Sequence, residues 1–234
     1  YILMRKDGEW QAMGTGVSAG TDVLAILVHS NGDIYVGGNF TAMSAVPNTA
    51  RIARWNGTTW ETVGGAGGII NDGGVLALAE APNGDVYVGG TFTNYGLGPT
   101  ICNRILRWDI SVPGWVVLNA GGAAQGLSGT VNGIDVDANG VMYCCGNFTQ
   151  DMGVPVVLNY VARYDPAPAD VFSALTAAPG VNARTYTVEI DLDGVTVYFG
   201  GRFTTDFGGV ANAYEYVIQY NPAPTNTFQN MAVL

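Results

Sequence analysis

Positive charge is scarce in this sequence. Of its 234 residues, 9 are Lys or Arg and 19 are Asp or Glu, and Lys6 is the single lysine. A surface so poor in cations cannot neutralise a run of phosphates, so we expect neither nucleic-acid binding nor docking to anionic lipid. No apolar stretch approaches the roughly 20 residues that a helix needs to cross a bilayer. Membrane insertion is therefore not expected either.

Histidine and cysteine are also scarce. A single histidine, His29, excludes a metal site built from several histidines. A Ser-His-Asp arrangement would have to use His29, and we expect no nucleophile elbow to accompany it. The three cysteines, Cys102, Cys144 and Cys145, are odd in number and two are adjacent, which fits neither a disulfide framework nor a metal spacing. These observations favour a protein without a catalytic residue and without a cofactor.

Glycine, by contrast, is abundant, with 34 residues, whereas charged residues make up only 12% of the chain. This composition suits tightly turned β-structure and gives little support to long surface helices. A repeat array can run to this length as one unit, so residues 1–234 are predicted to form a single all-β domain.

An internal repeat is the strongest signal in the chain. The segments GDIYVGGNFT from Gly32, GDVYVGGTFT from Gly84, GVMYCCGNFT from Gly140 and GVTVYFGGRFT from Gly194 are variants of one pattern. Each is followed by a second pattern, RIARW, RILRW, YVARY or YVIQY, whose aligned fourth positions are Arg54, Arg107, Arg163 and Gln219. The period of 53 to 56 residues fits a four-stranded propeller blade.

Four strands can be assigned within each repeat. An apolar run such as Val75 to Ala79 meets the turn Asn83-Gly84, which favours a two-residue hairpin. The return strand, Val86 to Phe92, is rich in β-branched and aromatic residues. The Arg-x-x-Arg-Trp strand follows, and the last strand carries one large aromatic residue, which is Trp60, Trp115, Phe172 or Phe228. The sequence therefore predicts four-stranded antiparallel blades.

The predicted boundaries leave half a blade over. Residues 1–16 provide only the last two strands of a blade, with Arg5 matching Arg54 and Trp10 matching Trp60, and complete blades follow at about 17–67, 68–121, 122–180 and 181–234. An unpaired blade edge is a site for strand addition. We therefore expect that the chain is a fragment of a longer one, or that a partner completes the opening blade in a larger assembly.

Several recurring residues are interpreted as structural. The glycine pairs Gly37-Gly38 and Gly89-Gly90 are expected to allow close approach of a neighbour. Cys144 and Cys145 replace packing residues of the other repeats, so we expect buried thiols. The recurring arginines are expected to bind loop carbonyls or an acidic neighbour.

The pattern G-D-[IV]-Y-V-G-G-[NT]-F-T, followed by Asn-x-x-Arg-Ile-x-Arg-Trp, resembles the repeats of kelch-like and related bacterial propeller families with a GGxFT strand. The resemblance covers nearly the whole chain. The fourth repeat departs most, with Tyr216 and Gln219 in place of the two arginines and an insertion at Val197, and the third has Tyr160 at the first arginine position. The resemblance implies a β-propeller.

Proteins with such repeats are secreted or cell-surface proteins of bacteria, or structural proteins of bacteriophages and other viruses. The resemblance therefore implies an extracellular or virion location. It favours a non-catalytic tail- or capsid-associated protein, or a surface adhesin. Its expected partners are other structural subunits or a host-surface glycan or receptor. Function is expected on the loops that follow each GGxFT strand, Ala42 to Thr49, Asn94 to Cys102, Gln150 to Asn159 and Thr205 to Ala213.

An acidic group is the main candidate for chemistry. Alignment places Asp135 opposite Glu189 and Asp137 opposite Asp191 in consecutive blades, and residues two apart in a strand share a face. With Asn139, Asp135 and Asp137 match the start of a calcium loop, although Gly146 stands where a bidentate glutamate would come. Three interpretations follow: solvated turn residues, a calcium site that stabilises an adhesive propeller, or the paired carboxylates of a carbohydrate-active enzyme.

Overall fold

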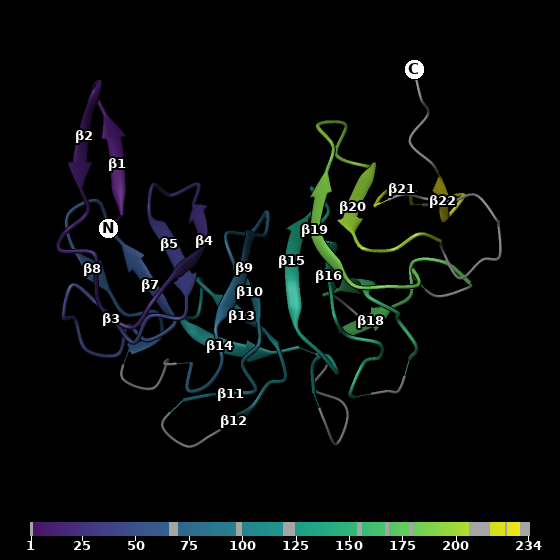
Figure 1. Ribbon diagram of the computed structural model, residues 1–234, viewed down its shortest axis with the longest axis horizontal. Helices are drawn as coiled ribbons and strands as arrows, with labels where there is room; N and C mark the ends of the chain where they lie inside the picture. The colour runs from purple at the N-terminus through teal and green to yellow at the C-terminus, as the bar shows by residue number, and fades with distance from the viewer. Residues whose placement is uncertain are drawn as a thin grey trace.

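Four antiparallel sheets of four strands each dominate the protein (Figure 1). The computed structural model describes residues 2–65, 70–96, 100–118, 125–153, 156–166, 169–177, 180–205, 216–222 and 224–229. Within each sheet the four strands are hydrogen-bonded in chain order. The predicted all-β class and the four-stranded antiparallel blades are therefore confirmed.

The strands of the four blades follow the repeat. In the first blade they are β4 (Val23–Val28), β5 (Ile34–Gly38), β7 (Ile52–Trp55) and β8 (Trp60–Glu61). In the second they are β9 (Val75–Glu80), β10 (Val86–Gly90), β13 (Ile105–Asp109) and β14 (Gly114–Val117). In the third they are β15 (Val131–Val136), β16 (Met142–Gly146), β17 (Val161–Asp165) and β18 (Val171–Ser173). In the fourth they are β19 (Thr185–Ile190), β20 (Val197–Gly201), β21 (Val217–Asn221) and β22 (Thr227–Gln229).

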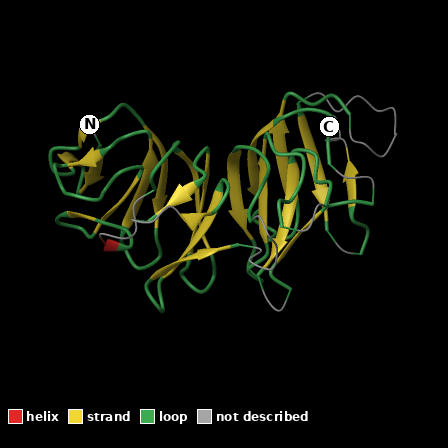
Figure 2. Ribbon diagram, turned by 90° about the horizontal axis from the view of Figure 1, so that it is seen from below, coloured by secondary structure: helices red, strands yellow, loops and turns green. Residues whose placement is uncertain are grey.

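The first strands of the blades, β4, β9, β15 and β19, contact one another in chain order. Figure 2 shows the sheets side by side along the molecule, and Figure 1 shows the strands of the first blade and those of the fourth blade at opposite sides. Because each blade has apolar residues on both faces, separate hydrophobic clusters fill the spaces between neighbouring blades. Packing between blades, rather than within one, forms the core.

The glycine pairs have the role that the sequence predicts. A Cβ on Gly89 would lie 2.6 Å from Cγ1 of Val131 in the next blade, and a Cβ on Gly37 would lie 2.2 Å from Cγ1 of Val75. The third blade leaves room for the fourth blade with a different pair of residues. Cys145 stands where the glycine is expected, and it pairs across the strands with Gly133, whereas Gly89 pairs with Ala77. In the third blade the glycine therefore stands on the first strand instead of the second, and the pair still leaves space for the next blade.

An N-terminal hairpin precedes the first blade. It consists of β1 (Leu3–Lys6) and β2 (Glu9–Ala12), joined by Asp7 and Gly8 with φ of 52° and 87°, as a tight hairpin turn requires. Met13, directly after the hairpin, accepts a 2.7 Å hydrogen bond from the Trp60 indole. Trp10 is 68% exposed whereas Trp60 is 3% exposed, so their surroundings differ although the sequence aligns them. The half-blade boundary at residues 1–16 stays a prediction.

Two short sheets support the loops that follow the second strands. One pairs β3 (Val17–Ala19) with β6 (Ala42–Met43), and the other pairs β11 (Asn94–Tyr95) with β12 (Thr100–Ile101). Parts of the predicted functional loops, 97–99, 154–155 and 206–213, lie outside the described residues. None of the described residues forms a helix long and apolar enough to span a membrane.

One face of β4 is uncovered. Leu24, Ile26 and Val28 are 46%, 60% and 71% exposed, whereas Leu78, the counterpart of Ile26 in β9, packs against a buried cluster. The difference arises because β4 of the first blade packs against β9. No blade packs against the other face of β4 among the described residues, and the N-terminal hairpin region packs against Val36 of β5 and Trp55 of β7 instead. The first blade thus presents an apolar strip to solvent.

Candidate functional site

A cleft lies between the first and second blades. Its volume is about 610 Å³. The first blade contributes residues of β5, β7 and the segment after β8, and the second contributes β13, β14, the turn between them and the loop after β10, so the Arg-x-x-Arg-Trp strands place Arg54 and Trp108. The lining residues are Tyr35, Arg54, Thr62, Val63, Gly64, Gly65, Tyr95, Trp108, Ile110, Pro113, Gly114 and Trp115. We call this space the aromatic cleft.

The second blade supplies the aromatic side of the cleft. Trp108 and Trp115 are paired across β13 and β14, and their rings meet edge to face with centroids 5.3 Å apart. Tyr95 approaches Trp115 from the loop after β10, at 6.3 Å. Trp108 is buried, but Trp115 and Tyr95 are only half-buried, so both keep accessible ring surface. The cleft therefore offers a firm aromatic wall.

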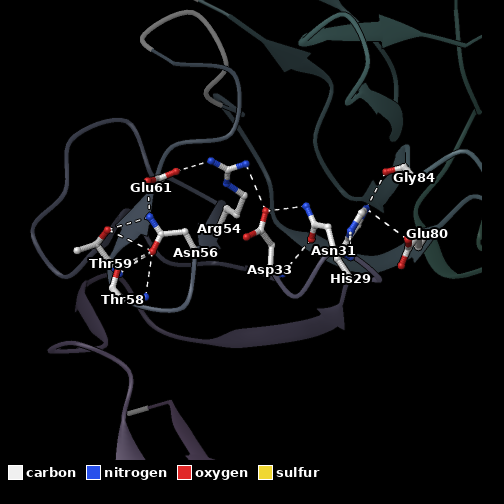
Figure 3. A network of polar contacts seen from close by, with 10 residues as sticks. All are labelled: His29, Asn31, Asp33, Arg54, Asn56, Thr58, Thr59, Glu61, Glu80 and Gly84. Atoms are coloured by element: carbon white, nitrogen blue, oxygen red, sulfur yellow. Dashed lines mark hydrogen bonds and ion pairs between the residues drawn. The ribbon is translucent and has the colours of Figure 1, made fainter.

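The first blade supplies the polar side. The Arg54 guanidinium binds Glu61, and it also reaches Asp33 at 3.4 Å (Figure 3). Asn56 donates a 2.5 Å hydrogen bond to Glu61 and so fixes the second carboxylate oxygen. The hydrogen bond from Arg54 lowers the pKa of Glu61. Burial works against the charge of Arg54, but Glu61 and Asp33 outweigh it and raise its pKa. Arg54 and Glu61 therefore both stay charged.

Two polar atoms near the floor of the cleft are buried without a hydrogen-bond partner among the described residues. They are the Tyr35 hydroxyl and Nε of Arg54. Burial raises the pKa of Tyr35, so its hydroxyl keeps its proton. Most buried polar groups in proteins are hydrogen-bonded, and an exception calls for an explanation.

A chain of hydrogen bonds leads from Arg54 to the second blade (Figure 3). Asn31 donates to Asp33 at 3.0 Å, and its backbone N–H donates to Nδ1 of His29 at 3.1 Å. Nε2 of His29 lies 2.8 Å from the carbonyl of Gly84, so we assign the proton to Nε2. His29 thus lies at the turn between β4 and β5, and it connects two blades.

The recurring arginines bind loop carbonyls or acidic neighbours, as predicted. Arg51 donates to the carbonyl of Asn39 at 2.5 Å, and Arg104 binds the carbonyl of Thr91 in the same way. The second arginine of each repeat binds acids instead: Arg54 binds Asp33 and Glu61, Arg107 binds Asp85, and Arg163 binds Asp165. The fourth blade keeps the geometry without charge, because Gln219 donates to Asn221 at 2.9 Å.

The structure does not gather the four carboxylates of the predicted acidic group around one point, and the cation site stays a prediction. Among the described residues, no three His, Cys, Asp or Glu side chains are placed to hold a metal ion. Asp135 instead accepts a 2.7 Å hydrogen bond from the backbone N–H of Ile190 in the next blade, and burial raises its pKa. Asp137 accepts hydrogen bonds from two backbone N–H groups of its own turn.

The remaining members of that group are turn or surface residues. Asn139 belongs to the turn that Asp137 closes, and Glu189 and Asp191 are exposed on the fourth blade. Of the three interpretations of the group, the structure favours the turn residues, because the two most constrained carboxylates are occupied by backbone donors.

All three cysteines are buried and free, and the repeat predicted the burial of Cys144 and Cys145. Burial raises the pKa of Cys102 and of Cys145 to about 12. Since the thiolate is the reactive form, both thiols are poor nucleophiles at neutral pH.

Sequence reasoning overlooked one motif and one site. The segment Gly16-Val17-Ser18-Ala19-Gly20 has the Gly-x-Ser-x-Gly spacing, but Ser18 lies in β3 and accepts a hydrogen bond from the N–H of Ala45 at 2.8 Å. His29 is occupied between the blades, so no nucleophile elbow results. The aromatic cleft was missed because Trp115 was interpreted only as a blade residue, and its one available signal was the Trp-Trp pair of the second repeat.

The geometry defines a β-propeller of four-stranded blades. No protein-family model matches the chain, and no curated protein matches its sequence. Among solved structures, the chain is similar to Ycf48 bound to D1 peptide, with a TM-score of 0.51 and 13% identity. The match covers 95% of this chain and 58% of that chain, and 58% of its seven blades is about four. The likeness is one of fold.

Proposed function

We propose that this protein is a non-catalytic β-propeller that binds other molecules on the surface of a virion or a bacterial cell. The observation that carries the proposal is the aromatic cleft, whose volume of about 610 Å³ lies within the range of roughly 300–1,000 Å³ for ligand pockets. Its walls come from two rigid blades, so the cleft is preformed. The surface location draws on the GGxFT-type repeats and their occurrence in secreted, cell-surface and phage structural proteins.

The electrostatics of the cleft favour binding over turnover. A carboxyl group that acts as a general acid near neutral pH needs a raised pKa. The pKa of Glu61 is lowered by Arg54 instead, and Asp33 shares the same guanidinium. These carboxylates are suited to accepting hydrogen bonds. As a tail- or capsid-associated protein or an adhesin, the propeller would contact another structural subunit, or a host glycan or receptor.

A combined binding and turnover assay tests this proposal. The protein is mixed separately with oligosaccharides and with a peptide library, tryptophan fluorescence follows occupancy of the cleft, and chromatography detects products. Saturable binding without products is expected, and it should weaken in Trp115→Ala. Product formation would identify an enzyme, and the absence of saturable binding by either class would exclude the cleft as a binding site.

A further inference from the structure

We infer that the aromatic cleft binds a neutral saccharide, with Trp115 and Tyr95 packed against the sugar ring and Arg54 and Glu61 bonded to its hydroxyl groups. This inference rests on the proposed function and names its ligand. A pyranose ring suits the cleft because it carries a face of C–H bonds and a rim of hydroxyl groups. The cleft has the corresponding halves, an aromatic wall from the second blade and a polar side from the first.

The aromatic wall suits the C–H face of the sugar ring. Trp115 is held from behind by Trp108 and from one side by Tyr95, so its orientation is fixed before a ligand arrives. Aromatic rings held in this way provide large contact area at little cost in conformational entropy. The wall is specific to this interface. The groove between the second and third blades, of about 390 Å³, has the equivalent Tyr87 and Arg107, but no tryptophan lines it.

The polar side suits the hydroxyl groups of the sugar. A hydroxyl group donates one hydrogen bond and accepts others, so it fits between a guanidinium and a carboxylate. Arg54 lines the cleft, and Glu61, which precedes the lining residue Thr62, is bonded to it; the two side chains are 33% and 38% exposed. The Tyr35 hydroxyl and Nε of Arg54, from residues paired across β5 and β7, are buried without a well-formed hydrogen bond.

Charge decides in favour of a neutral ligand. Asp33 and Glu61 bring two negative charges to the single positive charge of Arg54, and the whole chain carries a net charge of −10. An acidic sugar or a phosphate would therefore be repelled. A cationic ligand would meet Arg54 in the wall while both carboxylates are already bound to it. A neutral hydroxyl-rich ligand avoids both costs.

The experiment is a titration with lactose, maltose, cellobiose and mannobiose, with sialyllactose and glucuronic acid as acidic probes and a peptide library as the alternative. Tryptophan fluorescence measures affinity, and saturation-transfer NMR reports which sugar protons contact the protein. We expect at least one neutral disaccharide to saturate the cleft, with its C–H protons receiving the largest transfer. Acidic probes should bind more weakly.

Variants locate the site. Trp115→Ala should weaken binding at least tenfold, whereas Trp115→Phe, which keeps a ring, should retain it. Arg54→Gln should weaken binding about tenfold, because a hydrogen bond to a charged group is lost. This change copies Gln219 of the fourth blade, so the fold should tolerate it. Arg163→Gln is the matched control, because Arg163 forms the same type of ion pair away from the cleft, and it should leave affinity unchanged.

Each contrary outcome has a distinct meaning. Tightest binding of an acidic probe, or neutral binding that is insensitive to both Trp115→Ala and Arg54→Gln, would overturn the saccharide assignment. If a peptide binds with the Trp115 dependence and no sugar binds, the saccharide assignment fails while the proposed binding function stands. If neither class binds a folded protein, both proposals fail.

Discussion

His29 shows how a single side chain can join two blades. It is buried, donates to the Gly84 carbonyl of the second blade, and accepts from the Asn31 N–H of its own turn. Nothing in the sequence indicated this role, because the equivalent residues, Ala81, Asp137 and Asp191, are of other types. The same alignment position therefore makes different bonds in different blades.

His29→Ala is expected to lower the free energy of unfolding by about 1–3 kcal/mol, because it leaves the Gly84 carbonyl and the Asn31 N–H without a partner. Urea unfolding measures the effect. Ser30→Ala is the control, since Ser30 is an exposed residue that contacts Glu80 across the same interface, and it should cost about 0.5 kcal/mol or less. Equal costs would show that His29 has no special role.

Asp135 offers a test through pH. Burial raises its pKa in the folded state, so the folded protein holds this proton more tightly than the unfolded chain does. As pH rises from the usual aspartate pKa of about 3.9 through the folded value, this residue makes folding progressively less favourable. Asp135→Asn should remove that contribution, so the variant should gain stability relative to the wild type across this window.

Thermal or urea unfolding at several pH values measures the difference. Asp135→Ala is the matched variant, because it also removes the acceptor for the Ile190 N–H and should therefore be destabilising at every pH. A pH-independent difference between Asp135→Asn and the wild type would contradict the raised pKa.

The strands show why the blades pack at a fixed spacing. The second strands of the first two blades carry a glycine where the next blade approaches: a Cβ would lie 2.2 Å from Val75 at Gly37 and 2.6 Å from Val131 at Gly89. The fourth blade has Gly200 at the equivalent position, where a Cβ would meet Cγ2 of Thr187 in its own blade at 2.9 Å. The same residue type thus has different neighbours according to its blade.

Gly89→Ala should destabilise the protein by about 1–3 kcal/mol, because the new methyl group collides with Val131 and forces the second and third blades apart. Gly200→Ala should cost less, since a turn of the Thr187 side chain can relieve its contact. Urea unfolding of the two variants provides the comparison. A larger cost at Gly200 would show that contacts between blades do not set the requirement for glycine.

The assembled blades leave the apolar strip of Leu24, Ile26 and Val28 in contact with water. Contiguous apolar surface of this kind promotes association. We expect the isolated 24.5 kDa chain to associate as its concentration rises, and Ile26→Thr with Val28→Thr to shift it toward the monomer. Threonine keeps the β-branched shape, so stability should change little.

Size-exclusion chromatography with light scattering measures the association. Val112→Thr is the control, because Val112 is equally exposed but lies in a turn of the second blade, and it should change nothing. A wild-type chain that stays monomeric at every concentration would contradict the expectation.

The repeat was sufficient to predict the fold, because a period of 53 to 56 residues with a turn at Asn83-Gly84 specifies one arrangement of strands. It also predicted the roles of Arg51, Arg54 and the glycine pairs. The aromatic cleft could not be predicted in this way. It depends on Tyr95 approaching Trp115 from a loop, and on one interface differing from the next, and neither is encoded in a repeating pattern.

The exchange of glycine between Cys145 and Gly133 also bears on how such a chain could change over generations. Gly133 and Cys145 are paired across two strands and fill one space together, and in the second blade Ala77 and Gly89 fill the equivalent space. A lone Gly133→Ala change would place a methyl group 3.1 Å from the Cys145 sulfur and require a small shift, so the blade should reach the common arrangement more easily after Cys145 has become smaller. In an alignment of related chains, these two columns should therefore covary, and intermediates with both residues large should be rare.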